Sequence, residues 1–218
     1  MRTKILIKRA YHDTVTIPLM LLISAGFTQP TRLPSLSLKN VLSEFREIPP
    51  LGSEDKLQSY KIKALTNYIH HHFKVSEQKA SIIVHEAFIN GLNQGLQPEL
   101  ILAIIAVESN FKEKAVSKAG AHGLMQVMPS AHPKKIKSIG GRKGLYDLKK
   151  NISVGSKILA QYKDLSKGNI RRTLLRYNGS LGNARSKYPD KVFRIYKQMK
   201  NTARLNEQLL AVHMSENS

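Results

Sequence analysis

Apolar residues recur along most of this chain at intervals of three and four, and no segment alternates strictly between apolar and polar positions. The first pattern is typical of amphipathic helices, whereas the second would indicate strands. Proline, glycine and small polar residues separate the apolar stretches and predict the helix ends. Helices are predicted over residues 54–73, 76–94 and 98 to about 108, in a short segment from about residue 130, and over 149–165, 169–177 and 189–210. The chain is therefore expected to be all-α, with at most minor β-structure.

The second predicted helix, residues 76–94, carries an aliphatic stripe that we expect to face the core. The stripe consists of Ile82, Ile89, Leu92 and Leu96, and it also includes His85. A single histidine in such a stripe is expected to be a satisfied core residue rather than a ligand. The histidines at 70–72 cannot share one helical face, and no other ligand cluster supports a metal site. The sequence thus predicts no metal and no cofactor.

The third predicted helix ends in an acidic side chain on its apolar face. From Pro98 onward, Ile101, Ile104, Ile105 and Glu108 fall at helical spacing on one face. Burial disfavours an ionised carboxylate, and the negative end of the helix dipole acts in the same direction, so both raise its pKa. A carboxyl group still protonated near neutral pH is suited to protonate a leaving oxygen. The alternative is a rotated helix on whose surface Glu108 pairs with Lys112.

A second carboxylate is not placed beside Glu108 by the sequence. At about 100° per residue, Glu99 and Glu113 point roughly 180° and 140° away from it. Asp147 could approach Glu108 through the fold, but no local sequence feature places it there. Retaining and inverting glycosidases use two carboxyl groups, with substrate-assisted exceptions. The pattern therefore favours a mechanism with one acid.

Three ordered blocks over roughly residues 80–200 make the chain resemble the lytic transglycosylases with a lysozyme-like domain, which cleave bacterial cell-wall glycan. The blocks are Glu108-Ser109-Asn110-Phe111 with Ala115-Val116-Ser117 and Gly120-Ala121; Gly123-Leu124-Met125-Gln126 with Met128-Pro129 and Ala131; and Leu145-Tyr146-Asp147, Asn151-Ile152 and Gly155 with Tyr177-Asn178-Gly179.

The resemblance implies a helical fold and one reaction. Glu108 would protonate the bond between N-acetylmuramic acid and N-acetylglucosamine. It would then act as a base while the muramoyl 6-hydroxyl attacks its own anomeric carbon, giving a 1,6-anhydro end. The residue matching Ser109 would steady the glutamate or the nearby sugar. The positions implied to line the glycan groove are Ser117, Gln126, Met128, Tyr177 and Asn178. Structural roles are the alternative, with Ser117 as an N-cap, Tyr177 in the core and Met128 as packing.

The chain departs from the family pattern at three places. Where the family often reads Ala-Tyr-Asn-Ala-Gly-Pro-Gly, this chain has Arg176 before Tyr177-Asn178 and lacks the proline. Leu148 replaces a common proline after Asp147. His122 stands where small or polar residues are usual. These differences are interpreted as variation at the groove rim, which affects substrate preference rather than reaction type.

The N-terminal region predicts export. Residues 1–29 combine a basic start with a short apolar run, as in a signal peptide, although an uncleaved amphipathic segment is the alternative. Prolines and Gly52 within 30–53 indicate a linker, followed by the catalytic domain at 54–210 and a polar tail at 211–218. The protein is thus expected in the periplasm or secreted, with no integral span after processing. The absence of cysteine excludes a lipoprotein anchor and disulfides.

A formal net charge of +20 favours a polyanionic partner. Peptidoglycan glycan strands are the expected one. No nucleic-acid motif accompanies the charge, so no nucleic acid is expected. The sequence does not distinguish three biological roles: general remodelling of the wall, opening a gap for a secretion or conjugation machine as its partner, and service as a phage enzyme. The alternatives to a lytic transglycosylase are a murein hydrolase, in which water attacks, and a non-catalytic peptidoglycan-binding protein.

Overall fold

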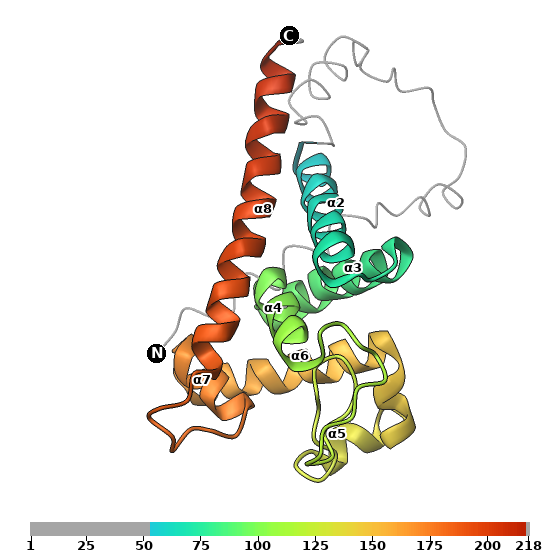
Figure 1. The fold of residues 1–218 in the computed structure, drawn as a ribbon, viewed down its shortest axis with the longest axis vertical. Coiled ribbons are helices and arrows are strands. Elements are labelled where there is room, and N and C mark those ends of the chain that lie inside the picture. Colours follow the sequence, from blue (N-terminus) through green and yellow to red (C-terminus); the bar gives the residue numbers. More distant parts are fainter. Residues whose placement is uncertain (1–52, 217–218) are drawn as a thin grey trace, which may run out of the picture. The chain divides into compact units, whose positions relative to one another are not determined.

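The computed structural model describes residues 53–216 and shows helices joined by loops (Figure 1). The helices are α2 (Ser53–Phe73), α3 (Glu77–Gln94), α4 (Pro98–Ser109), α5 (Pro133–Lys137), the 3₁₀ helix η1 (Arg142–Tyr146), α6 (Leu148–Leu165), α7 (Ile170–Tyr177) and α8 (Tyr188–Glu216). The only β-structure among these residues is a pair of isolated bridges, from Val116 to His122 and from His122 to Val127. The predicted all-α class is confirmed.

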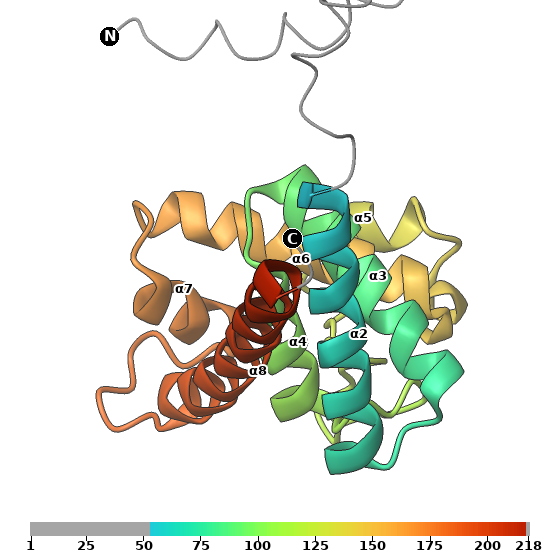
Figure 2. The ribbon, with the colours of Figure 1, turned by 90° about the horizontal axis from the view of Figure 1, so that it is seen from above.

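Helix α4 forms the centre of the described domain. Apolar residues occur all round it rather than on one stripe, and most of the helix is buried. A helix of this kind is stable only when neighbours surround it. Helices α3 and α8 pack against α4, and α2 packs against both α3 and α8 (Figures 1 and 2). Helix α6 lies against α3 and α7 and completes the core.

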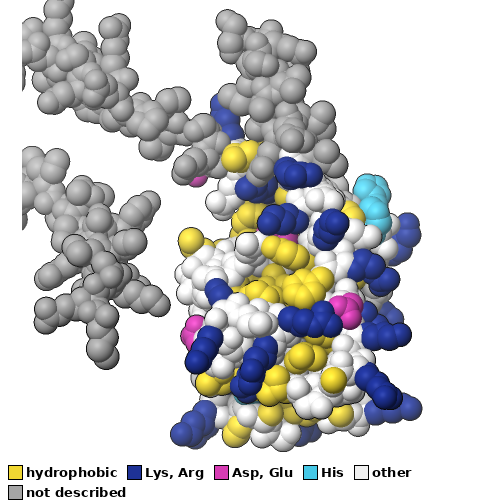
Figure 3. Space-filling view, turned by 90° about the vertical axis from the view of Figure 1, so that its left-hand side faces the viewer, with side chains coloured by type: hydrophobic (Ala, Val, Ile, Leu, Met, Phe, Trp, Pro, Cys, Tyr) yellow, Lys and Arg dark blue, Asp and Glu magenta, His cyan; other side chains and the backbone are white. Residues whose placement is uncertain are grey.

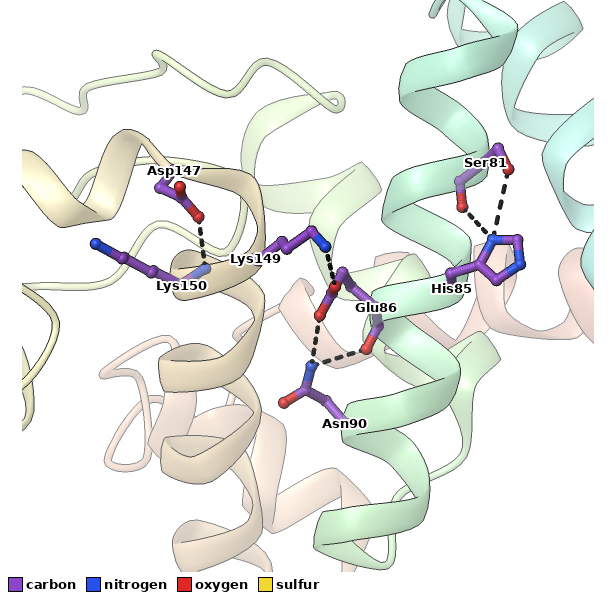
Figure 4. Close-up of polar contacts among 7 residues, drawn as sticks. All are labelled: Ser81, His85, Glu86, Asn90, Asp147, Lys149 and Lys150. Carbon is purple, nitrogen blue, oxygen red and sulfur yellow. Dashed lines mark hydrogen bonds and ion pairs between the residues drawn. The ribbon is translucent and has the colours of Figure 1, made fainter.

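Local residue types explain the ends of α4 and α6. Pro98 opens α4, where its missing N–H costs nothing, and Asn110 ends it in the left-handed conformation with φ 50°. Asp147 caps α6, because its Oδ1 accepts a hydrogen bond of 2.9 Å from the backbone N–H of Lys150 (Figure 4). Asp147 therefore has a capping role.

The predicted core stripe of α3 is wrong. Ile82, Ile89 and Leu92 are exposed, Leu92 to 86% of its surface, and only Leu96 is buried. His85 is also exposed, and its Nδ1 lies 2.8 Å from the carbonyl of Ser81 (Figure 4). The buried face consists instead of Ala80, Ile83, Val84, Ala87, Asn90 and Gly91.

Close packing explains this choice of face. A Cβ built on Gly91 would lie 2.8 Å from the carbonyl oxygen of Leu96, so the small residue is required where the chain turns back. On the side facing α6, Glu86 forms an ion pair with Lys149 and accepts hydrogen bonds from Asn90 (Figure 4). With this side of α3 turned toward α6, the aliphatic stripe is left in solvent.

Element ends differ in detail from the sequence predictions. Helix α5 begins at Pro133 rather than near residue 130, and the glycine-rich segment at 140–144 overlaps the start of η1. Helix α8 continues to Glu216, past the predicted end at 210 and into the predicted tail. The predicted signal segment, residues 1–29, and the linker, apart from its last residue, lie outside the described residues. The proposed domain boundaries stay a prediction.

Lys and Arg side chains are spread over the face on which α7 and α8 lie, with few acidic groups between them (Figure 3). Within residues 53–216 no helix is both long and apolar enough to cross a membrane. The same residues contain no group of three or more His, Cys, Asp or Glu side chains that could hold a metal ion.

Candidate active site

The loop between α4 and α5 folds back against α6 and forms one wall of a cavity. Within this loop, His122 forms one isolated β-bridge with Val116 and another with Val127. The side chain of Asn151 in α6 is fully buried and forms hydrogen bonds with the backbone of this loop. Its Oδ1 accepts a hydrogen bond of 2.8 Å from the N–H of Met125. Its Nδ2 donates to the carbonyls of His122 and Leu145 at 3.0 and 2.8 Å. One amide thus satisfies three buried backbone groups.

Glycines allow the loop to approach α6 this closely. Gly123 has φ +78°, and a Cβ there would lie 2.1 Å from Asn151 Nδ2 and 2.2 Å from the carbonyl oxygen of Leu145. On the other side, a Cβ at Gly155 would lie 2.5 Å from Sδ of Met125. The Gly-Leu-Met-Gln segment is therefore packed directly onto α6 through two glycines.

The cavity beside this loop has a volume of about 420 Å³. Glu108 lines it from the end of α4, and α7 supplies Arg176 and Tyr177. Among the residues predicted for the site, those that line it are Glu108, Ser117, Gln126, Met128, Tyr177 and Asn178. Side chains from four separate segments therefore meet where the sequence analysis expected a groove.

Ser109 is placed elsewhere. Its side chain is buried, and its hydroxyl donates a hydrogen bond of 3.1 Å to the carbonyl of Ile105 in its own helix. It does not line the cavity. The geometry suits a residue that holds the last turn of α4, and with it the backbone that carries Glu108.

Several predicted groove residues also hold the loop. Gln126 has φ 46°, and its Nε2 donates to the carbonyls of Ala115 and Gly123 at 3.1 and 2.9 Å. The hydroxyl of Ser117 accepts from the N–H of Ala121 at 3.0 Å. The hydroxyl of Tyr177 donates to the carbonyl of Met125 at 2.8 Å. Each of these polar groups has a structural partner as well as a place on the cavity wall.

The carboxyl group of Glu108 is half-buried, and its one hydrogen-bond partner among the described residues is Tyr188 at the start of α8. The Tyr188 hydroxyl donates to Glu108 Oε1 at 2.6 Å. Burial raises the pKa of Glu108 above its ordinary value, and the hydrogen bond from Tyr188 opposes that rise. Burial, followed by the nearby charge of Glu108, raises the pKa of Tyr188 far above its usual range. The phenol is therefore a permanent donor to Glu108.

Glu108 is the only acidic residue among those described that line the cavity. Glu113, one of the two rejected partners, forms an ion pair of 2.9 Å with Lys79, and Asp147 caps α6. The surface pair between Glu108 and Lys112 that the sequence left open is not formed, because Glu108 instead meets Tyr188. Within residues 53–216, the cavity is therefore lined by a single acidic side chain.

The interpretation of His122 as a groove-rim residue is wrong. Its side chain is buried, and its Nδ1 lies 2.9 Å from the hydroxyl of Tyr146, whose ring it meets edge to face. It does not line the cavity. The reason is the pair of bridges on its backbone, which turn this residue toward η1.

Sequence reasoning missed Tyr188, His132 and Tyr162 at the site, and it noted Arg176 only as a departure. Tyr188 follows Glu108 by 80 positions. A tyrosine before a predicted helix is a weak signal by itself. Only the packing of α8 on α4 brings the two side chains together.

Residues 87–199 match the family model described as the transglycosylase SLT domain, and the chain belongs to this family. The predicted family resemblance is confirmed.

Relatives from several bacteria bear the name membrane-bound lytic murein transglycosylase C. The one from Edwardsiella ictaluri is 38% identical over 101 residues, which cover 40% of this chain and 28% of the relative. The one from Yersinia pestis is 32% identical over 122 residues, which cover 50% of this chain and 32% of the relative. This chain therefore matches about a third or less of the length of these relatives.

Among solved structures, an inactive mutant of the lytic transglycosylase Slt from Pseudomonas aeruginosa is similar. It is 23% identical with a TM-score of 0.45, and the match covers 58% of this chain and 24% of that one.

Proposed function

We propose that the chain is a peptidoglycan lytic transglycosylase that cleaves the β-1,4 bond between N-acetylmuramic acid and N-acetylglucosamine. The observation that carries this proposal is a single glutamic acid with a raised pKa in a cavity that no other described carboxylate lines. Membership of the SLT family supports it. The relatives' name supports murein as the substrate.

In the first step, Glu108 acts as a general acid. Tyr188 occupies Oε1, so Oε2 is the oxygen that carries the proton. That proton passes to the glycosidic oxygen as its bond to the muramoyl C1 breaks, and the bonding electrons leave with the N-acetylglucosamine unit. The substrate's own N-acetyl group supports the positive charge at C1, in the role that a second carboxylate has in ordinary glycosidases.

In the second step, the same residue acts as a base. The Glu108 carboxylate takes the proton of the muramoyl 6-hydroxyl while that oxygen bonds to C1, which gives the 1,6-anhydro ring and restores the acid. No water is consumed. The hydrogen bond from Tyr188 stabilises the carboxylate that exists between the two steps, because a bond to an ionised acceptor is stronger than one to a neutral acceptor.

The remaining cavity residues are proposed to hold the glycan. The Nε2 donors of Gln126 are engaged by the loop, so its Oε1 is the atom suited to accept from a sugar hydroxyl or N-acetyl group. Tyr177 contributes its ring, since its hydroxyl is bound to Met125. Ser117, Met128 and Asn178 complete the proposed contacts. Since this substrate is cell-wall glycan, we place the protein in the periplasm or outside the cell.

Product analysis tests the reaction. Purified sacculi digested by the protein should yield muropeptides that end in 1,6-anhydro-N-acetylmuramic acid when examined by mass spectrometry. Products with reducing ends, heavier by one water, would instead identify a hydrolase. Binding without any released product would identify a non-catalytic binding protein.

Replacing Tyr188 by phenylalanine should slow turnover by roughly tenfold to a hundredfold, since a hydrogen bond to a charged group contributes about 1.5–3 kcal/mol. The change should also shift the pH profile. Tyr188 lowers the pKa of Glu108, so its loss raises that pKa. The reaction needs protonated Glu108 and fades as pH rises through that pKa. The basic limb of kcat/KM should therefore move to higher pH.

Tyr68→Phe is the matched control, because it removes a phenol whose only described hydrogen bond is to Gln198 on the surface. It should leave both rate and pH profile unchanged. A basic limb that stays in place or moves to lower pH in Tyr188→Phe would contradict the role given to this hydrogen bond.

A further inference from the structure

Arg176 is the one permanent cation among the described residues that line the active-site cavity. It belongs to the last turn of α7, directly before Tyr177, where the family often has alanine. The side chain is only partly exposed. His132 is the other basic residue on the wall, and burial together with the charge of Lys135 lowers its pKa. Arg176 is therefore the positive charge that a ligand would meet near neutral pH.

One N–H group of the guanidinium lacks the partner that a buried polar group usually has. Its Nε is buried and makes no hydrogen bond within the described part of the chain. By contrast, Arg171 of the same helix forms an ion pair of 2.6 Å with Asp190. A buried donor left unsatisfied is costly, and such groups in folded proteins usually meet a partner, but no described group of this chain supplies one.

Glu108 does not neutralise Arg176. It is the only acidic residue on the described cavity wall, its hydrogen bond is to Tyr188, and no ion pair joins it to Arg176. Burial raises the pKa of Glu108, which favours the neutral form of its carboxyl group over the anion that would pair with Arg176. An anion for Arg176 must therefore come with the ligand.

We propose that Arg176 binds a carboxylate carried by the muramoyl unit of the substrate and so determines which glycan strands the cavity accepts. This inference rests on the proposed function, because that function sets the ligand in the cavity. The carboxylate has two sources. On a strand without stem peptides it is the lactyl carboxylate of the sugar itself, and on a strand with stems it belongs to the peptide.

Arginine suits this task better than lysine. Its planar guanidinium presents paired N–H groups that bind both oxygens of a carboxylate, whereas an ammonium group is a point charge. A bidentate contact of this kind also orients the sugar to which the carboxylate is attached. The contact would distinguish muramoyl glycan from a polymer of N-acetylglucosamine alone, which has no carboxylate.

Binding is the measurement that tests the proposal independently of turnover. Dissociation constants are measured by calorimetry in a Glu108→Gln background, with and without Arg176→Ala. The ligands are stem-free glycan, stem-bearing glycan and N-acetylglucosamine oligomers of matched length. We expect Arg176→Ala to raise Kd about tenfold, or about 1.4 kcal/mol, for a carboxylate-bearing glycan, and to leave the neutral oligomer unaffected. Arg176→Lys should recover only part of the loss.

Arg172→Ala is the matched control, since it removes the same charge from an exposed site on the same helix outside the cavity. It should leave all three constants unchanged. A loss confined to stem-free strands supports the proposal and identifies the lactyl carboxylate, while a loss confined to stem-bearing strands supports it and identifies the peptide. No loss, an equal loss on the neutral oligomer, or an equal loss in Arg172→Ala overturns it. Because the readout is binding, a failure of the proposed reaction is recognised separately, from the products of the unmodified protein.

Discussion

The Glu108→Gln protein should release anhydro-muropeptides at least about a thousandfold more slowly than the unmodified protein while still binding glycan strands. General acid–base catalysis contributes roughly 10²–10⁴ in rate, and here one side chain supplies both the acid and the base. Glutamine has nearly the same shape and still accepts the hydrogen bond from Tyr188, so the cavity wall is preserved. Turnover is measured by release of soluble anhydro-muropeptides from purified sacculi, and binding by co-sedimentation.

Glu99→Gln is the control for this variant. Glu99 lies in the first turn of the same helix and does not line the cavity. The substitution makes the same chemical change, from a carboxyl group to an amide, and should leave turnover intact. Turnover of Glu108→Gln within tenfold of the unmodified protein would remove Glu108 from the role of acid, and with it the proposed mechanism.

Gly123→Ala should lower the free energy of unfolding by about 3 kcal/mol. The left-handed conformation at φ +78° costs a residue with a Cβ about 1 kcal/mol or more. The new methyl group would also overlap Asn151 and a backbone carbonyl at about 2 Å, and relieving such overpacking costs about 1–3 kcal/mol. For a domain of this size the total lowers Tm by roughly 10 °C. Thermal unfolding followed by circular dichroism measures it.

Gly120→Ala separates the two causes. Gly120 also has positive φ, at +86°, but nothing lies within 4 Å of a Cβ built there. Gly120→Ala should lower the free energy of unfolding only by the cost of the left-handed backbone conformation, about 1 kcal/mol. If the two variants unfold at the same temperature, the tight packing of the loop onto α6 is not what constrains Gly123.

The helices were predictable because their signals are local. Spacing, Pro98 at a first turn and Gly95 at a C-terminus determine where α3 and α4 begin and end. The position of Glu108 was predictable for a similar reason, since it continues an apolar run that has to be buried. A β-structure limited to two bridges also fits the absence of alternating segments.

The buried face of α3 was not predictable from hydrophobicity alone. Ile82, Ile89 and Leu92 form one aliphatic stripe, yet the face with Ile83, Val84, Ala87 and Gly91 is buried. Small residues let helices approach closely, and total packing against α2, α4 and α6 outweighs the transfer of three aliphatic side chains from water. A sequence pattern indicates how polar each face of a helix is, but it does not indicate which face fits closely against the neighbouring helices.

The polar contacts of the site were missed because they join distant segments. Asn151 contacts backbone groups at 122, 125 and 145, and Tyr188 reaches Glu108 from another helix. No spacing rule connects such positions. The predicted residues Gln126 and Tyr177 did reach the cavity, but their polar groups also hold the loop, which only the fold reveals.

The central claim is that burial keeps the Glu108 carboxyl group protonated until a glycosidic oxygen takes its proton. A ¹³C NMR titration of the protein labelled at the glutamate side-chain carboxyl carbons tests it most directly, with the Glu108 signal assigned by its loss in Glu108→Gln. We predict that this signal titrates at a pH above the usual range for glutamate. A Glu108 signal that titrates within that range, or below it, would contradict the claim.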